Sequence, residues 1–207
     1  MPLVFQQNIN EHTQLGLWKI EEEIDFFSTV NKNAKEISHP QKRIQHLAGR
    51  FLLKLLLPEL DVESISYSAS GKPFVKHQSY FFSVSHTDGW VAAIVSKQKN
   101  VAIDMEIISD KAYQIRDRFL SPRELTLMIP GLIEVSNLAT MLWSVKESLY
   151  KYYSQGAVDF KRDLQINQIE KLRANTFSIL CQINMQTEMH VEVIGMHEHE
   201  FVVTYII

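Results

Sequence analysis

The sequence predicts an α+β fold of two pseudo-symmetric halves, each with a long helix packed on an antiparallel sheet. Two stretches, near residues 41–57 and 137–156, repeat apolar residues at the three- and four-residue spacing of an amphipathic helix. Short β-rich runs bounded by polar turns accompany each stretch. Because this order of helix and strands occurs twice, we expect two domains, residues 1–102 and residues 103–207.

The first half begins with two predicted strands within residues 1–20. An acidic segment at 21–30 is expected to open a short helix, and a polar loop follows. Pro40 starts the long helix, because proline is favoured in a first helical turn, and Pro58 ends it. The remaining predicted strands of this half lie at residues 65–69, 74–75 and 80–84.

The second half is expected to contain three helices before its strands. The first covers residues 110–119, and the second begins at Ser121, which has the residue type of a helix cap. Proline and glycine at 130–131 break the second helix. Asn137 is expected to cap the long third helix and Gly156 to stop it. Four strands follow, at residues 164–169, 176–183, 189–194 and 201–207.

The composition argues against several classes of protein. Hydrophobic residues make up 45% and charged residues 22% of the 207 residues, which is ordinary for a globular chain. A net charge of -3 gives no basic excess for nucleic acid. The single cysteine, Cys181, excludes an internal disulfide and a cysteine-rich zinc site. Without a signal-peptide pattern or a long apolar run, we expect a cytoplasmic protein that does not cross a membrane.

The stretch from Phe81 to Glu106 contains the first candidate site. Asp104 and Glu106 are two residues apart on a predicted strand, so both side chains leave the same face. Two carboxylates on one face are costly unless a cation compensates them, and Mg²⁺ suits one or two carboxylates together with substrate phosphates. The alternative is a pair of solvated carboxylates at a strand end.

The third helix contains a second candidate pair. Glu147 and Lys151 are four residues apart and therefore lie on one face. By itself, this spacing indicates a surface ion pair. Its functional interpretation is a third metal carboxylate with a cation one turn away that could hold a phosphate.

Taken together, four motifs occur in the order and with the residue types of one family. They are Gly71-Lys72-Pro73, then Phe82-Ser83-Val84-Ser85-His86, then Asp104-Met105-Glu106, and finally Trp143-Ser144-Val145-Lys146-Glu147-Ser148-Leu149-Tyr150-Lys151. In these motifs the chain resembles the 4'-phosphopantetheinyl transferases, specifically the larger two-half type that activates peptide and polyketide synthases. The resemblance covers residues 41–160. Its last two motifs in combination are specific, whereas the Gly-Lys-Pro turn is weak.

The resemblance implies Mg²⁺ as cofactor and coenzyme A as substrate. The implied metal ligands, which would also bring the metal to the pyrophosphate of coenzyme A, are Asp104, Glu106 and Glu147. The implied contacts to coenzyme A are Lys72 and His86 at its phosphates and Ser85 in the nucleotide pocket.

The resemblance also implies the catalytic groups. Lys151 would hold the attacked phosphate and protonate the departing 3',5'-ADP. Glu124 would accept the proton of the carrier serine, directly or through water, and Glu147 would act with the metal. Attack of a hydroxyl on such a phosphate requires charge neutralisation, in-line positioning and a proton acceptor, which these residues could supply.

The chain departs from the family pattern at a few positions. Ser154 stands where the first glycine of a Gly-x-Gly follows the lysine, which leaves the path of that loop open. Met105 replaces an isoleucine, a tolerable apolar change, and Ser83 replaces an asparagine. Arg43 and Arg50 share a helix face, and the motifs assign neither of them a role.

We therefore expect a Mg²⁺-dependent enzyme that moves 4'-phosphopantetheine from coenzyme A to a serine of an acyl or peptidyl carrier protein. Two alternatives remain at this point, a metal-dependent phosphohydrolase and a non-catalytic relative that binds coenzyme A or a carrier. The sequence does not identify the carrier. Two halves in one chain could complete a site without a second subunit, so we expect a monomer.

Overall fold

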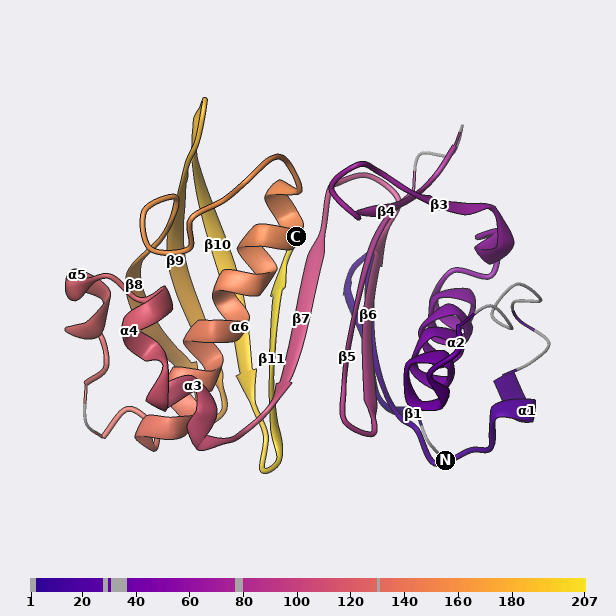
Figure 1. Cartoon of the computed structure of the whole chain (residues 1–207), viewed down its shortest axis with the longest axis horizontal. Coiled ribbons are helices and arrows are strands. Elements are labelled where there is room, and N and C mark those ends of the chain that lie inside the picture. Colours follow the sequence, from indigo (N-terminus) through magenta and orange to yellow (C-terminus); the bar gives the residue numbers. More distant parts are fainter. Residues whose placement is uncertain (1–2, 28–29, 31–36, 77–79, 130) are drawn as a thin grey trace. The chain divides into compact units, whose positions relative to one another are not determined.

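The computed structural model describes residues 3–27, 30, 37–76, 80–129 and 131–207. Most of the polar loop that was predicted before Pro40, and Pro130, lie outside the described residues. The described chain combines helices with antiparallel sheets, which confirms the predicted α+β class (Figure 1). No helix among the described residues has the length and apolar character that crossing a membrane requires.

Two compact units make up the chain, and each has one long helix and one main sheet. Unit 1 is Met1–Ile103 together with Ile207, and unit 2 is Asp104–Ile206. The predicted division into domains 1–102 and 103–207 stays a prediction, because compactness alone does not show that each half folds independently.

Unit 1 has a four-stranded sheet in the order β1-β2-β6-β5, with antiparallel neighbours. Its strands are β1 (Leu3–Asn10), β2 (Thr13–Lys19), β5 (Phe81–Thr87) and β6 (Trp90–Ser96). A separate two-stranded sheet pairs β3 (Ile65–Tyr67) with β4 (Pro73–Val75) after a 3₁₀ turn at Val62–Ser64. The helices are α1 (Ile24–Phe27) and α2 (Pro40–Leu56).

Helix α2 begins and ends close to the positions that the prolines predict. Pro40 occupies the first turn, where its missing N–H costs nothing, and the side chain of His39 caps the helix by accepting from the Lys42 N–H. The buried face of α2 packs on the sheet at a close approach: a Cβ on Gly16 would lie 3.1 Å from the side chains of Leu52 and Leu56. Glycine at position 16 therefore lets the helix lie tightly against β2.

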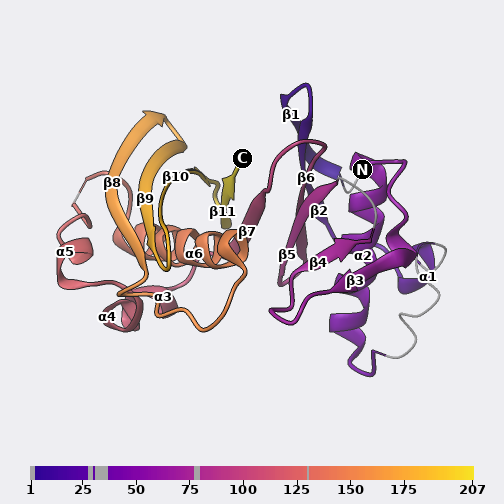
Figure 2. The same ribbon diagram turned by 90° about the horizontal axis from the view of Figure 1, so that it is seen from above.

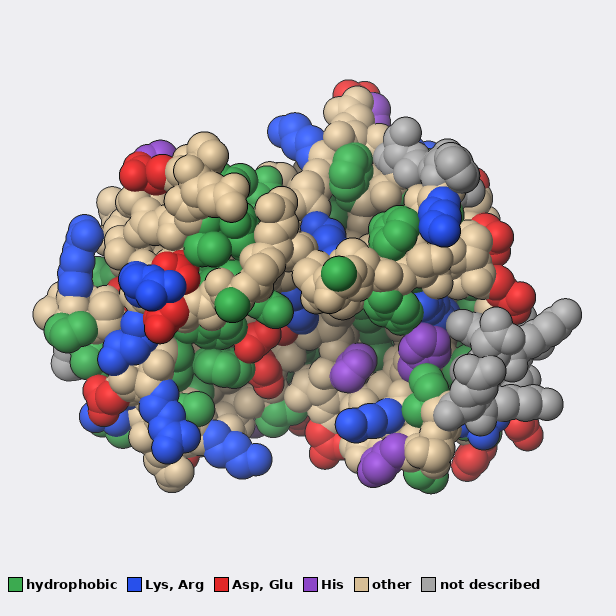
Figure 3. Space-filling view, turned by 45° about the horizontal axis from the view of Figure 1, so that its top comes forward, with side chains coloured by type: hydrophobic (Ala, Val, Ile, Leu, Met, Phe, Trp, Pro, Cys, Tyr) green, Lys and Arg blue, Asp and Glu red, His purple; other side chains and the backbone are tan. Residues whose placement is uncertain are grey.

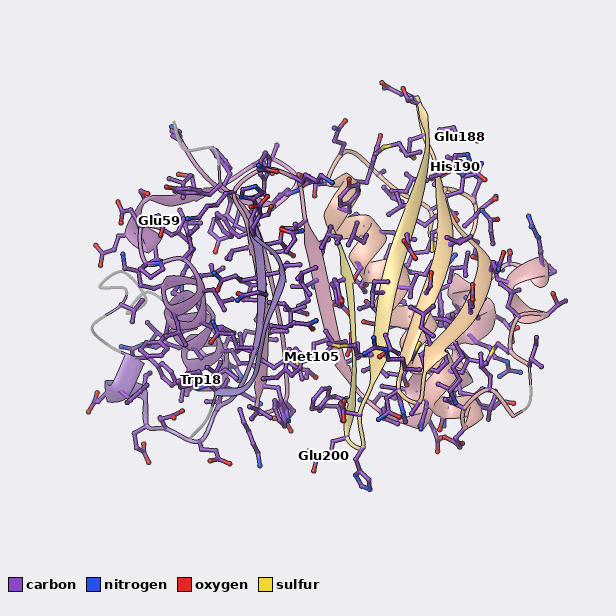
Figure 4. All side chains as sticks on the ribbon, turned by 180° about the vertical axis from the view of Figure 1, so that it is seen from behind. Trp18, Glu59, Met105, Glu188, His190 and Glu200 are labelled. Carbon is purple, nitrogen blue, oxygen red and sulfur yellow. The ribbon has the colours of Figure 1, made fainter. Side chains whose placement is uncertain are left out.

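An aromatic cluster closes one end of this core. Trp18 projects from β2 toward α1 and α2 (Figure 4), where its ring centroid lies 5.1 Å from that of Phe51 and 6.3 Å from that of Phe27. Phe26 also joins the cluster, at 5.0 Å from Phe27. The edge-on contact between Phe27 and Phe51, with centroids 5.6 Å apart, joins the short helix α1 directly to α2.

Unit 2 has a five-stranded sheet in the order β7-β11-β10-β9-β8, and the pairs from β8 to β11 are antiparallel. Helix α6 lies along one face of this sheet, as Figures 1 and 2 both show. The strands are β7 (Ala102–Ile107), β8 (Leu164–Arg173), β9 (Thr176–Asn184), β10 (Glu188–His197) and β11 (Phe201–Ile206). The helices are α3 (Asp110–Gln114), α4 (Arg116–Phe119), α5 (Pro122–Leu125) and α6 (Val135–Tyr153).

The helix ends of unit 2 differ from the prediction at several points. The predicted helix at 110–119 is two short helices, because Ile115 leaves helical geometry at φ -105° and ψ 7°. Helix α5 ends at Leu125, well before the predicted break at 130–131, although Ser121 and Glu124 do form the expected reciprocal capping box.

Helix α6 starts and stops earlier than predicted. Its N-cap is Glu134, and Asn137 lies inside the first turn, where its side-chain amide is 2.8 Å from the His197 ring. The helix ends at Tyr153, and its C-cap is Ser154, whose φ of 53° is left-handed, so Gly156 is not the residue that stops it. A serine has thus taken the left-handed position that usually falls to glycine.

Candidate functional site

The candidate site of unit 2 lies where strand β7 meets helix α6. Asp104 and Glu106 occupy alternate positions of β7, and both accept hydrogen bonds from α6. The Ser144 hydroxyl donates to Asp104 Oδ2 at 2.8 Å, and the Trp143 indole N–H donates to Glu106 Oε1 at 3.1 Å. The shared strand face thus directs both carboxylates to one side of the long helix, as period-2 spacing predicts.

Asp104 is the buried centre of this arrangement. Its side chain is 5% exposed, and its Oδ1 lies 2.7 Å from the ammonium of Lys151, whose side chain is 28% exposed. The Ser144 hydroxyl that contacts its other oxygen also lies 2.9 Å from the Thr204 hydroxyl of β11. A buried carboxylate requires such partners, and α6 supplies both a charge and a dipole.

Burial disfavours the ionised forms of the other two carboxylates, Glu106 and Glu147. Burial, and then the charge of Asp104, raise the pKa of Glu106 to about 7, with Glu147 adding to the rise and the Trp143 hydrogen bond and Lys151 opposing it. Burial and Asp104 likewise raise the pKa of Glu147, against the effect of Lys151. The three carboxylates therefore lie near enough to disfavour one another's ionisation.

This donor set fits a hard cation in its chemistry. Mg²⁺ prefers oxygen ligands, and its positive charge would reduce the repulsion that disfavours the ionisation of all three carboxylates together. The described residues contain no preformed group of three or more side chains arranged to hold a metal ion. The assignment of Asp104, Glu106 and Glu147 as metal ligands stays a prediction.

Glu124, the predicted base, lies in a different hydrogen-bond network. Its Oε1 accepts from the Lys146 ammonium at 2.5 Å and from the Ile166 backbone N–H at 2.7 Å. Its Oε2 accepts from the Ser121 N–H at 2.7 Å, which completes the capping box. Both oxygens are therefore engaged, and Glu124 is only 1% exposed. Its role as base stays a prediction.

Unit 1 carries the residues predicted to contact coenzyme A. Lys72 donates from its ammonium to the Asn100 side chain at 2.6 Å, and burial lowers its pKa. Ser85 is buried on β5, and His86 follows it with an exposed side chain. A partly buried cation whose charged form is disfavoured would be stabilised by an anion, as the resemblance implies for Lys72.

Two further basic residues of α2 belong to this part of unit 1. Burial lowers the pKa of His46, and the nearby charges of Arg50 and His86 lower it further. Arg50 is itself buried and donates to the Tyr67 hydroxyl at 3.0 Å. His46, Arg50 and His86 thus form a group of basic side chains whose positive charges would disfavour one another. Sequence reasoning assigned no role to Arg50 and missed His46, which looks like an ordinary helix residue.

Sequence reasoning also assigned no role to the three α6 residues that organise unit 2. Trp143 and Ser144 hold the carboxylates, and Lys146 binds Glu124. The position of Lys146 in the sequence does indicate burial, because it falls in the apolar stripe of the helix, four residues after Leu142 and three before Leu149. A lysine at such a position is buried only with a partner.

Comparison with known proteins found one matching family model and several similar proteins. The family model of the 4'-phosphopantetheinyl transferase superfamily matches residues 100–206, which include β7, α6 and the carboxylates. Over 116 residues, the chain is 26% identical to enterobactin synthase component D of Salmonella typhimurium, covering 55% of this chain and 49% of that protein. The corresponding Salmonella typhi protein is 25% identical over the same length and the same shares.

A fungal protein is similar as well. The chain is 31% identical over 109 residues to the L-aminoadipate-semialdehyde dehydrogenase-phosphopantetheinyl transferase of Candida glabrata, covering 47% of this chain and 42% of that protein. The chain spans about half the length of the curated relatives that it matches.

Proposed function

Because the chain belongs to the 4'-phosphopantetheinyl transferase superfamily, we propose that it transfers 4'-phosphopantetheine from coenzyme A to a serine of an acyl or peptidyl carrier protein. The serine Oγ forms a bond to the phosphorus next to pantetheine, the pyrophosphate P–O bond breaks, and 3',5'-ADP leaves. The observation that carries the proposal is the meeting of Asp104, Glu106 and Glu147 with Lys151 at the contact between β7 and α6.

The carboxylates and the lysine would divide the electrostatic work. Asp104, Glu106 and Glu147 would hold Mg²⁺, which when bound supplies positive charge to the phosphates. Lys151 would place a second positive charge at the transferred phosphate and donate a proton to the departing 3',5'-ADP. Its contact with Asp104 supports this role, because the carboxylate fixes the ammonium beside the cluster.

One carboxylate must accept the proton of the serine. Glu147 suits this task because burial and Asp104 raise its pKa above the ordinary value, which makes it a stronger base than an ordinary glutamate. The resemblance assigns the task to Glu124, but Lys146, Ile166 and Ser121 already engage both of its oxygens. We therefore favour Glu147 as the base.

In unit 1, Lys72, Ser85 and His86 would bind coenzyme A. The partial burial of Lys72 and the basic side chains of His46 and Arg50 near His86 support this assignment, since phosphates would stabilise the positive charge of each. We expect His46 and Arg50 to add to the same anionic contact.

The carrier is expected to dock on unit 2 near residues 110–130. Lys and Arg side chains are spread over the left part of Figure 3, where α3, α4 and α5 lie. Arg118 is exposed, whereas Arg116 already donates to the Tyr113 carbonyl at 2.7 Å and stacks on the Tyr113 ring. Phe119 is 2% exposed and belongs to the core. Arg118 is therefore the better candidate for an acidic helix of the carrier, and its charge reversal should weaken carrier binding.

The decisive experiment is a mass measurement on apo-carrier proteins incubated with coenzyme A and Mg²⁺. We expect a gain of one phosphopantetheine unit on the carrier serine, and loss of that gain in Lys151→Met. Release of 3',5'-ADP without a carrier would indicate a phosphohydrolase instead. Binding of coenzyme A with no transfer to any of several carriers would indicate a protein that only binds. The cytoplasmic location and the monomer are part of the proposal, and light scattering tests the latter.

A further inference from the structure

A closed network of hydrogen bonds joins three elements of unit 2 around Lys146. This side chain is fully buried, and its ammonium donates to Glu124 Oε1, to the Phe160 carbonyl at 2.8 Å and to the Leu164 carbonyl. An ammonium has three donors, and here each has an acceptor. Helix α5, helix α6 and the segment that leads into β8 are therefore held at one point.

The same network is complete on the side of the carboxylate. The Glu124 oxygens accept from Lys146, from the Ile166 N–H of β8 and from the Ser121 N–H. Buried ionic networks of this kind are stable only when every member is satisfied, and they then fix one arrangement of the elements that they join. Proton transfer to such a carboxylate would break the pair that holds Lys146.

A path of contacts leads from this pair to the candidate metal site. Lys146 holds the backbone of Phe160, whose ring lies 5.7 Å from the ring of Trp143. Phe119 also packs on the indole, at 5.1 Å and nearly edge-on. The indole donates its N–H to Glu106. A continuous chain of contacts therefore links the pair to the indole N–H that binds Glu106.

We propose that Glu124 and Lys146 are positioning residues, which act through Phe160 and Trp143 to orient the Glu106 carboxylate, and that Glu124 is not the base. The expected effect of the two residues on the transfer rate rests on the proposed function. Their expected effect on the orientation of Trp143 does not. Groups that orient the ligands of a site commonly change affinity or activity by about 10- to 100-fold when they are removed.

The test uses Glu124→Gln, Lys146→Met and the double variant, in protein labelled with 5-fluorotryptophan. The chain has three tryptophans, and Trp143→Phe identifies the Trp143 fluorine resonance. We expect each single variant to shift that resonance and to lower kcat about 10- to 100-fold, with KM for coenzyme A nearly unchanged. The double variant should be no slower than the slower single variant, because the residues act as one unit. Both limbs of the pH–rate profile should persist.

Other outcomes would overturn the proposal. If Glu124→Gln removes the acidic limb of the profile while the Trp143 resonance stays in place, Glu124 is a base. If stability falls but neither resonance nor rate changes, the pair is only structural. Glu124→Gln alone decides the question if Lys146→Met does not fold, since it keeps the side-chain shape. Lys171→Met, an exposed lysine of β8, is the matched control and should change neither reading. If the wild type transfers nothing, the proposed function fails. The Trp143 fluorine resonance of the variants still shows whether Glu124 and Lys146 position the indole.

Discussion

The ammonium of Lys151 lies 2.7 Å from Oδ1 of Asp104, so the lysine predicted to hold the phosphate is the counter-ion of a carboxylate predicted to hold the metal. The two cations would therefore compete for the charge of one buried carboxylate. Lys151 and Mg²⁺ can act together only if the negative charge of the substrate phosphates lies between the two cations and reduces their repulsion.

We predict that Lys151→Met binds Mn²⁺, as a probe for Mg²⁺, about tenfold more tightly than the wild type when no coenzyme A is added. Removing the ammonium leaves Asp104 without its charged partner, which raises the attraction for a divalent cation. Titration calorimetry or electron paramagnetic resonance measures this affinity. Lys171→Met is the control, and weaker Mn²⁺ binding by Lys151→Met would contradict the competition.

The raised pKa of Glu106 predicts a loss of stability as pH rises. Its folded-state pKa of about 7 lies above the ordinary value of 4.5, so the folded protein binds more protons than the unfolded chain in this window. The Glu106 contribution to the free energy of unfolding is therefore largest below pH 4.5 and falls as pH approaches 7 and above.

Urea unfolding at several pH values between about 5 and 8 measures this effect. His46 and His197, whose pKa values are lowered mainly by burial, act in the opposite direction, so the comparison must be with Glu106→Gln. The difference in unfolding free energy between the two proteins should move in favour of the variant as pH rises. Parallel curves would show that Glu106 keeps an ordinary pKa.

We predict that Trp143→Phe lowers transfer activity about tenfold while leaving the fold intact. Phenylalanine keeps an aromatic ring at the position that contacts Phe119 and Phe160 but lacks the N–H that binds Glu106. Because that hydrogen bond holds the pKa of Glu106 down, its loss should raise the pKa further and weaken Mn²⁺ binding near neutral pH.

Mn²⁺ affinity and kcat/KM, each measured across pH, test this prediction. Tyr150→Phe is a suitable control, because Tyr150 packs on the same Phe160 ring and loses only its hydroxyl. Equal losses in both variants would show that ring packing, rather than the bond to Glu106, matters.

Local patterns in the sequence predicted the fold class and the faces of the elements well, because they depend on residue spacing alone. Pro40 marked the start of α2, and the two-residue spacing placed Asp104 and Glu106 on one strand face. The capping-box pattern at Ser121 was also correct. The family motifs found every carboxylate of the β7–α6 cluster.

Contacts between residues that are far apart in the sequence could not be predicted from residue spacing. Glu124 had the residue type of a base, and only the fold shows that Lys146, 22 positions away, engages its carboxylate. The start of α6 was misplaced because Asn137 is a favoured cap type, whereas the chain caps the helix at Glu134, a type with a weaker preference. The side-chain amide of Asn137 instead forms a hydrogen bond with the ring of His197 on β10.

The end of α6 supplies a last prediction, since Ser154 holds a left-handed conformation at φ 53°. This conformation costs a non-glycine residue about 1–2 kcal/mol, although Ser154 regains part of it by donating its hydroxyl to the Lys151 carbonyl. Glycine would remove the strain but loses that bond and gains freedom in the unfolded chain. We therefore expect Ser154→Gly to raise the free energy of unfolding by at most about 1 kcal/mol.

Gly156 is the matched position, because it is also left-handed, at φ 61°, and a Cβ there would meet open space. Gly156→Ala should lower the free energy of unfolding by about 1 kcal/mol through backbone strain alone. Urea unfolding of both variants, with activity measured beside it, tests the pair. If Ser154→Gly loses stability as Gly156→Ala does, the serine hydroxyl stabilises the helix end more than the left-handed backbone strains it. Lys151 lies one turn before this end, so a fall in activity without a fall in stability would show that the serine also steadies the lysine.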